Sequence, residues 1–338
     1  GKHRVKHRDK AEKTAEGKSK KNAATGARKM KEEIRLSFAP MEGVTGPIFR
    51  RVHSKMFGGV DLYYSPFLQA NKNHCFKHRE EREYLPFDSK LVPQVMASNP
   101  QDFVWAARML RETGYREVNL NLGCPAATIV TKKKGAGLLR DLNALDRYLD
   151  EIFECGDLPA VSVKTRTGFE TSDNAAALGR IYAKYPLCEV VIHPRAREQY
   201  YNGTADTVAF LRMREQLDCP VCYNGDIRSP EDFRRIQKEL DGVKHFMIGR
   251  GLLADPALAL KIKGTPGRWD KRSVHEYLTV LWEEYMKEFS GERDVLFKMK
   301  ELWYYLEWQY PDAQKEIGAI RKCKSAAEYK RLIAQLLL

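Results

Sequence analysis

The sequence predicts an α/β protein, namely a (β/α)8 barrel of the TIM type followed by a small all-helical C-terminal domain. Eight short apolar runs recur between residues 34 and 264, and amphipathic stretches separate most of them. This alternation is typical of parallel strands joined by crossover helices. Beyond residue 264 the strand-like runs stop. We therefore predict a basic N-terminal arm over residues 1–33, a barrel over 34–264 and a helical domain over 265–338.

The eight apolar runs are assigned to barrel strands in chain order. They cover residues 36–40, 60–65, 92–97, 117–121, 160–164, 190–193, 221–224 and 245–248. No Gly-x-Gly-x-x-Gly motif follows the first run, which argues against a doubly wound sheet.

Helix signals lie between these runs and after them. Pro100 and Pro230 stand at predicted first helical positions, where a missing N–H costs nothing, and Ser229 is a predicted N-cap. The predicted helices include residues 100–113, 173–185 and 230–240 in the barrel, and 273–289 and 295–310 in the C-terminal domain.

Positive charge is concentrated at the N-terminus. The net charge is +13, and residues 1–33 hold twelve Lys/Arg against five Asp/Glu, so the arm supplies +7 of it. We predict that this arm is disordered or partly helical and that the protein binds a polyanion. A solvated arm without a binding role is the alternative.

The composition predicts a soluble, cytoplasmic protein. No run approaches the ~20 apolar residues of a membrane span, and the N-terminus lacks the apolar segment of a signal peptide. Seven cysteines without disulfide spacing favour a reducing compartment. Cys219 and Cys222 lack a second pair of ligands, so no metal site is expected. A monomer is the default expectation.

Polar residues and glycines gather where the predicted strands end. In a parallel barrel the chemistry lies at these carboxyl ends. Buried polar groups need partners, and one bound cofactor would supply partners for many of them. The residues concerned are Pro40, Met41, Glu42, Gln94, Asn119, Asn121, Lys164, Arg166, His193, Arg195, Arg197, Asn224, Gly225, Asp226, Gly249 and Arg250.

The turns after the last two strands, residues 224–226 and 249–251, predict a phosphate site. Glycine-rich turns there leave backbone N–H groups free, and Arg250 adds positive charge. Lys164 ends the fifth strand, where an ammonium would face the N1/O2 edge of a flavin, with a salt bridge as the alternative. His193 ends the sixth strand and would hydrogen-bond the cofactor, with a structural role as the alternative.

Cys124 is predicted to lie in a turn, because a glycine and a proline flank it. A free thiol has a pKa of about 8.5, so it keeps its proton at neutral pH and can act as a general acid. Core packing is the alternative role. The basic run that follows holds Lys132, Lys133 and Lys134. It is predicted to form a mobile lid that contacts phosphates of a polymeric substrate, with a solvated loop as the alternative.

Together these motifs resemble the dihydrouridine synthase family, over roughly residues 35–335. The resemblance is specific because seven motifs occur in the family's order. They are APMEGVT at 39–45, NLNLGCP at 119–125, GAGLL at 135–139, VKTRTG at 163–168, HPRAR at 193–197, NGDI at 224–227 and IGRG at 248–251.

The resemblance implies an oxidoreductase that uses FMN and NADPH to reduce uridine to 5,6-dihydrouridine in RNA, with tRNA as the expected substrate. Hydride would pass from flavin N5 to uracil C6, and Cys124 would protonate C5. The implied FMN ligands are Pro40, Met41, Glu42, Gln94, Asn121, Lys164, His193, Asn224, Gly225, Asp226, Gly249 and Arg250. The expected RNA contacts are Lys132, Lys133, Lys134, Arg166, Arg195, Arg197 and the helical RNA-binding domain over 265–338.

Four positions depart from the family pattern. Glu42 replaces the usual alanine, Gly46 replaces an aspartate, and His-Pro-Arg-Ala at 193–196 replaces His-Gly-Arg-Thr. These departures concern the first loop and the substrate side of the sixth strand. Three alternatives stay open: ribosomal RNA as the substrate, an FMN barrel that reduces a small molecule, and an RNA-binding barrel without catalysis.

Overall fold

A computed structural model describes residues 34–338, so the predicted arm over residues 1–33 lies outside the described residues. Residues 36–338 form one compact unit. Within the described range no helix is both long enough and apolar enough to span a lipid bilayer.

The strands of this unit form one sheet of parallel neighbours, in the order β3-β5-β6-β7-β8-β9-β10-β1-β2-β4. Their bounds are β1 Arg35–Phe38, β2 Leu62–Tyr64, β3 Leu68–Gln69, β4 Leu91–Val92, β5 Gln94–Met96, β6 Glu117–Leu122, β7 Ala160–Gly168, β8 Leu187–Ala196, β9 Val221–Asn224 and β10 His245–Ile248.

The sheet closes into a barrel through β4 and β5, which are two halves of one extended run separated by Pro93. On one side of this run, the Ser65 N–H donates to Val92 O at 3.2 Å. On the other side, the Asn119 N–H donates to Pro93 O at 3.0 Å. Proline has no N–H, so the ladder is interrupted only at that point. The predicted third strand, residues 92–97, lies in this run, and the predicted eight-stranded barrel is confirmed.

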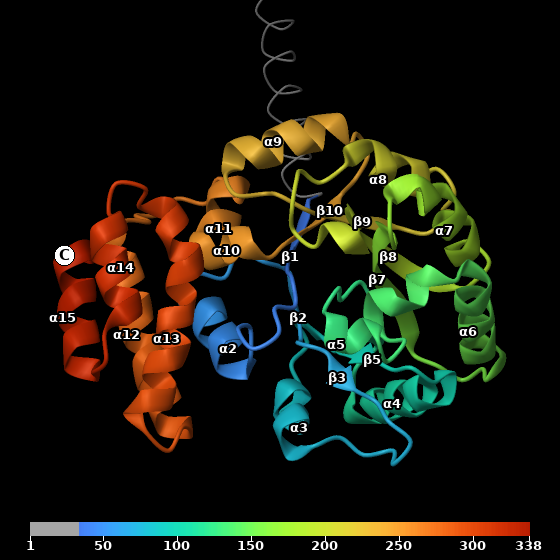
Figure 1. The fold of residues 1–338 in the computed structure, drawn as a ribbon, viewed down its shortest axis with the longest axis horizontal. Coiled ribbons are helices and arrows are strands. Elements are labelled where there is room, and N and C mark those ends of the chain that lie inside the picture. The colour runs from blue at the N-terminus through green and yellow to red at the C-terminus, as the bar shows by residue number, and fades with distance from the viewer. Residues whose placement is uncertain (1–33) are drawn as a thin grey trace, which may run out of the picture. The chain divides into compact units, whose positions relative to one another are not determined.

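Helices cover the outside of the barrel (Figure 1). They are α2 Pro47–Met56, α3 His78–Tyr84, α4 Pro100–Thr113, α5 Ala127–Val130, α6 Leu142–Glu154, α7 Ala175–Tyr182, α8 Thr207–Arg214, α9 Pro230–Glu239, α10 Arg250–Ala254 and α11 Leu258–Lys263. The expected start signals are present, because Pro100 and Pro230 lie in the first turns of α4 and α9. The Ser229 side chain accepts from the Asp232 N–H and caps α9.

Two strands are longer than their apolar runs predict. Strand β7 continues past the expected end at residue 164, and β8 continues past 193. Arg166 and Arg195 therefore lie inside strands, and each is 1% exposed. Hydropathy cannot detect such positions, because an arginine is buried only where carbonyl or carboxylate partners receive its donors.

The strand signals stop after the barrel, as predicted, and the chain ends in helices. These are α12 Lys271–Glu288, α13 Glu292–Leu306, the short η4 Glu307–Gln309, α14 Gln314–Lys322 and α15 Ala326–Leu337. Helix α12 packs on α2, and α13 packs on α10 (Figure 1). Trp282 and Trp303 are buried between these helices, whereas Tyr304 is 58% exposed.

Candidate active site

Two adjoining pockets open at the carboxyl ends of the barrel strands. One is lined by the turns after β9 and β10, and the other by the loop that carries Cys124. They share the residues Pro40, Met41, Lys164, His193, Tyr201 and Arg250. The strand ends therefore place most of the predicted site residues around one continuous hollow.

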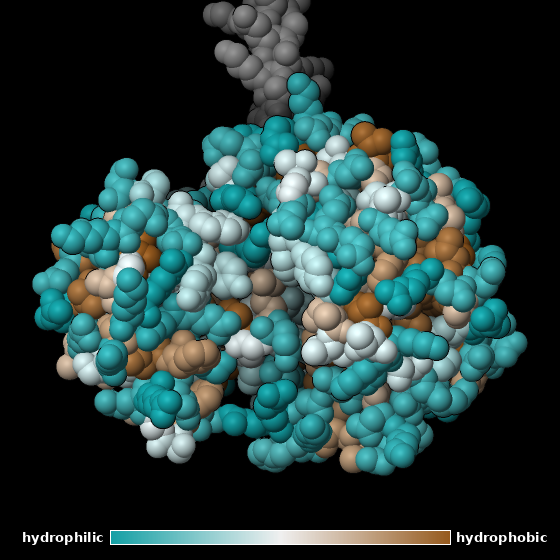
Figure 2. Space-filling view, viewed as in Figure 1, coloured by the Kyte–Doolittle hydropathy of each residue, from teal (hydrophilic) through white to brown (hydrophobic). Residues whose placement is uncertain are grey.

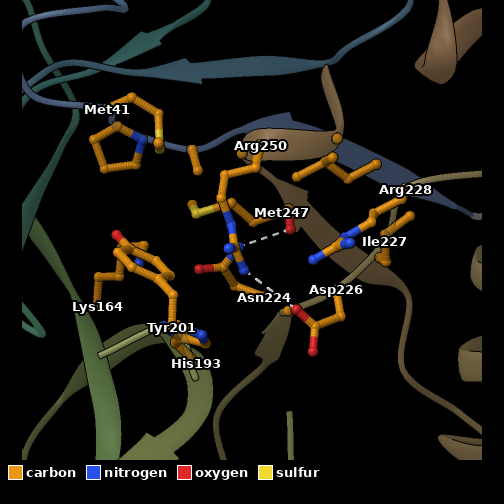
Figure 3. Close-up of a pocket in the computed structure, with 16 residues that line it drawn as sticks. Met41, Lys164, His193, Tyr201, Asn224, Asp226, Ile227, Arg228, Met247 and Arg250 are labelled. Carbon is orange, nitrogen blue, oxygen red and sulfur yellow. Dashed lines mark hydrogen bonds and ion pairs between the residues drawn. The ribbon is translucent and has the colours of Figure 1, made fainter. Parts of the chain in front are cut away.

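The turns after β9 and β10 form the first pocket. The Asn224 Nδ2 donates to Met247 O at 2.9 Å and joins the two strand ends (Figure 3). Within residues 34–338 the backbone N–H groups of Gly225 and Gly249 donate to no protein acceptor. A Cβ on Gly249 would lie 3.3 Å from the Met41 sulfur. Free N–H groups behind bare glycine Cα atoms fit an anionic oxygen ligand.

Arg250 extends into this pocket toward Asn224 and Asp226 (Figure 3). Its Nη2 lies 3.3 Å from Asp226 Oδ1, and Arg195 Nη2 lies 2.7 Å from Asp226 Oδ2. Burial pushes the Asp226 pKa upward, but hydrogen bonds from Arg195 and the Ala205 N–H outweigh burial and lower it overall. Asp226 thus stays ionised, and its charge is matched by two arginines.

Lys164 lies on β7 and faces both pockets. Burial, with a contribution from nearby Arg166, lowers its pKa to about 8. Among the described residues no carboxylate forms an ion pair with its ammonium, so the alternative salt bridge is not formed there. A partly buried cation without an anion fits an anionic edge of a bound ligand.

His193 is held as a neutral imidazole. Its Nε2 lies 3.0 Å from Arg195 Nη1. A guanidinium only donates hydrogen bonds, so Nε2 must accept and the proton sits on Nδ1. Burial, and then the neighbouring Arg166, Lys164 and Arg195 charges, lower its pKa well below the ordinary value. His193 can therefore offer an N–H donor throughout the physiological pH range.

A chain of buried polar side chains crosses the barrel and ends at the Cys124 loop. Ser162 Oγ donates to Glu117 Oε1 at 2.6 Å, and Asn119 Nδ2 donates to Ser162 Oγ at 2.9 Å. Gln94 Nε2 donates to Asn119 Oδ1, and Asn121 Nδ2 donates to Gln94 Oε1, both at 2.8 Å. The chain fixes both predicted amide ligands, Gln94 and Asn121, in one orientation.

The loop of residues 123–125 is anchored on every side. Asn121 Oδ1 accepts the N–H groups of residues 123 and 124 at 3.1 and 3.0 Å. Arg166 Nε donates to the carbonyl of residue 123 at 2.9 Å, and Arg197 Nε donates to that of residue 125 at 3.1 Å. The carbonyl of residue 124 accepts from the Ala136 N–H at 3.0 Å. Each carbonyl of the loop is thus held by a separate donor.

The Cys124 thiol lines the second pocket, together with Glu42 and Asn121. Burial raises its pKa, the Glu42 charge adds to the rise, and Arg166 and Lys164 oppose it. A raised pKa keeps the thiol protonated at neutral pH. The arrangement suits a proton donor rather than a thiolate nucleophile.

The predicted RNA contacts fall into two groups. Lys132 and Lys133 are exposed and Lys134 is half-buried, between α5 and the short 3-10 helix Gly135–Arg140. The arginines are instead inside the protein. Arg166, Arg195 and Arg197 are at most 9% exposed and donate to carbonyls of neighbouring loops.

Sequence reasoning missed several aromatic and cationic residues around the hollow. Tyr201 lines both pockets, with the Arg250 guanidinium 4.5 Å from its ring centroid. Tyr305 of α13 lines the Cys124 pocket. The Arg228 guanidinium lies 4.2 Å from the Trp308 ring centroid. Their sequence signals are weak, because the aromatic residues of the C-terminal helices have the same spacing as core residues.

Comparison with known proteins identifies related sequences. The sequence profile of the dihydrouridine synthase family matches residues 37–337. A tRNA-dihydrouridine(16) synthase of Pseudomonas syringae pv. tomato is 28% identical over 306 residues, which cover 86% of this chain and 95% of that protein. A tRNA-dihydrouridine synthase B of Xanthomonas campestris pv. campestris is 28% identical over 223 residues, which cover 66% of this chain and 67% of that protein.

Solved structures match at the level of the fold alone. Morphinone reductase superposes with a TM-score of 0.50 at 12% identity, over 70% of this chain and 87% of that one. Histamine dehydrogenase from Rhizobium sp. 4-9 superposes with a TM-score of 0.51 at 14% identity, over 73% of this chain and 49% of that one.

Proposed function

Since the chain belongs to the dihydrouridine synthase family, we propose that it reduces uridine to 5,6-dihydrouridine in tRNA, with FMN as its cofactor and NADPH as the reductant. The observation that carries the proposal is the Cys124 thiol on a loop that Asn121, Arg166 and Arg197 anchor, in a pocket that Lys164 also lines. The related proteins named above as tRNA-dihydrouridine synthases support the choice of substrate.

The residues of the first pocket fit FMN. The free N–H groups of Gly225 and Gly249, with Arg250, would hold the phosphate. Lys164 would supply the cation opposite the flavin N1/O2 edge, and His193 an N–H donor to the bound cofactor. Bound FMN would supply the hydride that reduces the uracil ring at C6.

The protein's own part in the reduction is to deliver a proton. Cys124 would donate the thiol proton to uracil C5, and its raised pKa keeps that proton in place before the reaction. The anchored loop would fix the distance from the thiol to C5, because Asn121, Arg166 and Arg197 leave the loop little freedom.

The RNA would approach at the mouth of the barrel. The target base must leave its stack to reach a pocket at the strand ends. Exposed Lys132 and Lys133 would contact phosphates, and the C-terminal helices, which place Tyr305 in the pocket wall, would form the second RNA-binding surface. We also propose a monomer located in the cytoplasm, where tRNA is available.

Flavin retention and Cys124→Ala test this function. The purified protein should release FMN on denaturation. Cys124→Ala should lose about 10²- to 10⁴-fold in uridine reduction while NADPH oxidation continues. Cys75→Ala is the matched control, because Cys75 is an exposed free cysteine. Equal activity of Cys124→Ala and Cys75→Ala would contradict the role of Cys124.

The substrate is tested by mass spectrometry of cellular RNA from a strain that lacks the protein. The proposal expects loss of dihydrouridine from tRNA and its return when the wild-type protein is restored. Loss of dihydrouridine from ribosomal RNA alone would show that ribosomal RNA, and not tRNA, is the substrate. No change in either RNA would favour reduction of a small molecule.

A further inference from the structure

A second cleft adjoins the Cys124 pocket and shares Glu42, Pro66 and Phe67 with it. Its other walls come from α2, α3 and the neighbouring parts of α12 and α13. Figure 2 shows the surface hollowed between the C-terminal helices and the barrel, and Figure 1 shows α3 facing the lower ends of α12 and α13 there. We call this cleft, between Glu42, Phe67, Arg79, Phe289 and Lys298, the lateral cleft.

Two of the acidic side chains around the lateral cleft are already engaged in hydrogen bonds or an ion pair within the protein. Glu80 accepts the N–H groups of Gln69 and Lys77 at 2.8 and 3.0 Å. Glu83 pairs with buried Arg50 at 2.8 Å. These carboxylates hold α3 in place and have little capacity for a ligand.

Three charged groups remain available at the lateral cleft. The Arg79 side chain is exposed and forms no hydrogen bond or ion pair with another described residue, although its charge opposes the rise of the Glu42 pKa. Lys298 Nζ donates to Gly43 O at 2.9 Å and keeps two further donors. Glu42 accepts no hydrogen bond within the described range, and burial raises its pKa. The cleft thus combines two cations with one carboxyl group that needs a donor.

Aromatic faces provide the rest of the lateral cleft. Phe67 and Phe289 are half-buried lining residues. The Phe289 ring packs edge-to-face on Tyr285, with centroids 5.8 Å apart, which fixes its orientation. Lys298 Nζ lies 5.8 Å from the centroids of both the Tyr285 and Phe289 rings. Ordered aromatic faces beside cations are the combination that holds an unstacked nucleotide.

We infer that the lateral cleft binds the RNA nucleotide next to the target uridine, with its base on Phe289 and its phosphate near Arg79 and Lys298. The inference rests on the proposed function. The lateral cleft and the Cys124 pocket have Glu42, Pro66 and Phe67 as a common wall, so the nucleotide joined to the uridine by one phosphodiester has a binding cleft directly beside the target pocket. A flipped-out target leaves its neighbour unstacked, and the lateral cleft offers that base a new partner.

Glu42 gives this nucleotide site a preference. Its carboxylate can accept two N–H groups at once, and guanine presents N1–H and N2–H side by side on its Watson–Crick edge. Adenine and uracil each present fewer donors on that edge. Guanine is therefore the expected neighbour.

The test compares Phe289→Ala and Arg79→Gln with wild-type holoenzyme on stem-loop RNAs. The position beside the uridine carries guanosine, adenosine or an abasic site. Phe289→Ala should lower kcat/KM on the guanosine RNA roughly 5- to 150-fold, as for loss of one base stack. The same change should have no effect on the abasic RNA. Arg79→Gln should raise KM on all three RNAs, and Glu42→Gln should reduce the preference for guanosine over adenosine.

Phe297→Ala is the matched control, because Phe297 is a 74% exposed aromatic of α13 outside the lateral cleft. It should leave all three RNAs unaffected. An equal loss for Phe289→Ala on guanosine and abasic RNAs would overturn the inference, and so would a rise in the KM for NADPH, which would assign the lateral cleft to the reductant. The proposed function fails separately, if the wild-type protein reduces no RNA uridine at all.

Discussion

Replacing Arg197 with methionine separates two roles for this arginine, an RNA contact and an anchor of the Cys124 loop. Its Nε donates to Pro125 O at 3.1 Å, and its other nitrogens contact Glu198 and the Tyr200 hydroxyl at 2.8 and 2.9 Å. Methionine keeps an apolar side chain of adaptable shape but offers no donor. The loop would lose its anchor after Cys124, and proton transfer to uracil should slow.

The structure sets the size of this effect. Only the bond to Pro125 O links Arg197 to the catalytic loop, and a hydrogen bond from a charged group contributes about 1.5–3 kcal/mol. If the whole contribution is lost in the transition state, kcat for uridine reduction falls about 10- to 150-fold, because each 1.36 kcal/mol is a factor of ten. Arg197 is 9% exposed, so the KM for RNA should not change.

The assay is single-turnover reduction of RNA uridine, followed by mass spectrometry at several RNA and salt concentrations. NADPH oxidation serves as the internal reference and should match the wild type. Lys132→Met is the control for an exposed lysine, where loss of a phosphate contact raises KM and lowers the salt slope by about 1. If Arg197→Met behaves like Lys132→Met and keeps its kcat, the positioning role is refuted.

Three further predictions concern Lys164, Arg250 and a pair of glycines. The pKa of Lys164 in the folded protein is about 8, below its ordinary value of 10.5. Between pH 8 and 10.5 the folded flavin-free protein therefore binds fewer protons than the unfolded chain. Its free energy of unfolding should rise as the pH increases through this range. Lys164→Met should remove that gain and stabilise the flavin-free protein at pH 7 by about 3 kcal/mol in denaturant unfolding, whereas an unchanged pH profile would count against it. Arg250→Gln should weaken FMN binding more than riboflavin binding in calorimetry, and equal losses would remove its phosphate role. Gly251→Ala would place a Cβ 2.0 Å from a backbone oxygen, so it should lower the midpoint of thermal unfolding. The Cβ of Gly318→Ala would meet no atom within 4 Å, so this change should raise the free energy of unfolding by about 0.5–1 kcal/mol. Equal unfolding midpoints for the two variants would contradict both predictions.

The barrel could be predicted because its strands are buried on both faces and therefore appear as apolar runs. The limits of this signal are visible in β7. Its first half is apolar, but Arg166 in its second half is buried only because the carbonyls of residues 123, 196 and 200 receive its donors. Those carbonyls lie far along the chain or in turns, so no local pattern reports them. Apolar runs thus locate the core of a strand, but not the extension of β7 or β8 past a buried arginine.

The site was predictable where function depends on the backbone, and less so where it depends on distant side chains. Glycine turns after β9 and β10 and the flanked Cys124 are local features, and the strand-end rule brings them together. Tyr201 and Tyr305 reach the same pocket from a loop and from a C-terminal helix. The position of Tyr305 follows from the packing of α13 on α10, which sequence periodicity does not specify.

Net charge also gave an incomplete account of the predicted RNA surface. Arg166, Arg195 and Arg197 contribute three positive charges to the barrel, yet all three are buried and donate to backbone carbonyls. A buried cation whose donors are used attracts phosphate weakly, so the surface available to RNA is less positive than composition suggests. Exposed Lys132 and Lys133 are the better candidates within the predicted set.

The direction of the hydrogen bonds below Cys124 explains how a residue at the start of β6 bears on the thiol at its end. A carboxylate only accepts, so the Ser162 hydroxyl must donate to Glu117 and present its lone pairs to Asn119. The Asn119 amide must then turn its oxygen to Gln94, and the Gln94 amide must turn its oxygen to Asn121. Asn121 consequently has its own oxygen left for the N–H groups of the catalytic loop. The direction of the Asn121 amide, and so its two bonds to the loop, is therefore set by the Glu117 carboxylate at the far end of the strand, through side chains that line up only after the barrel has closed.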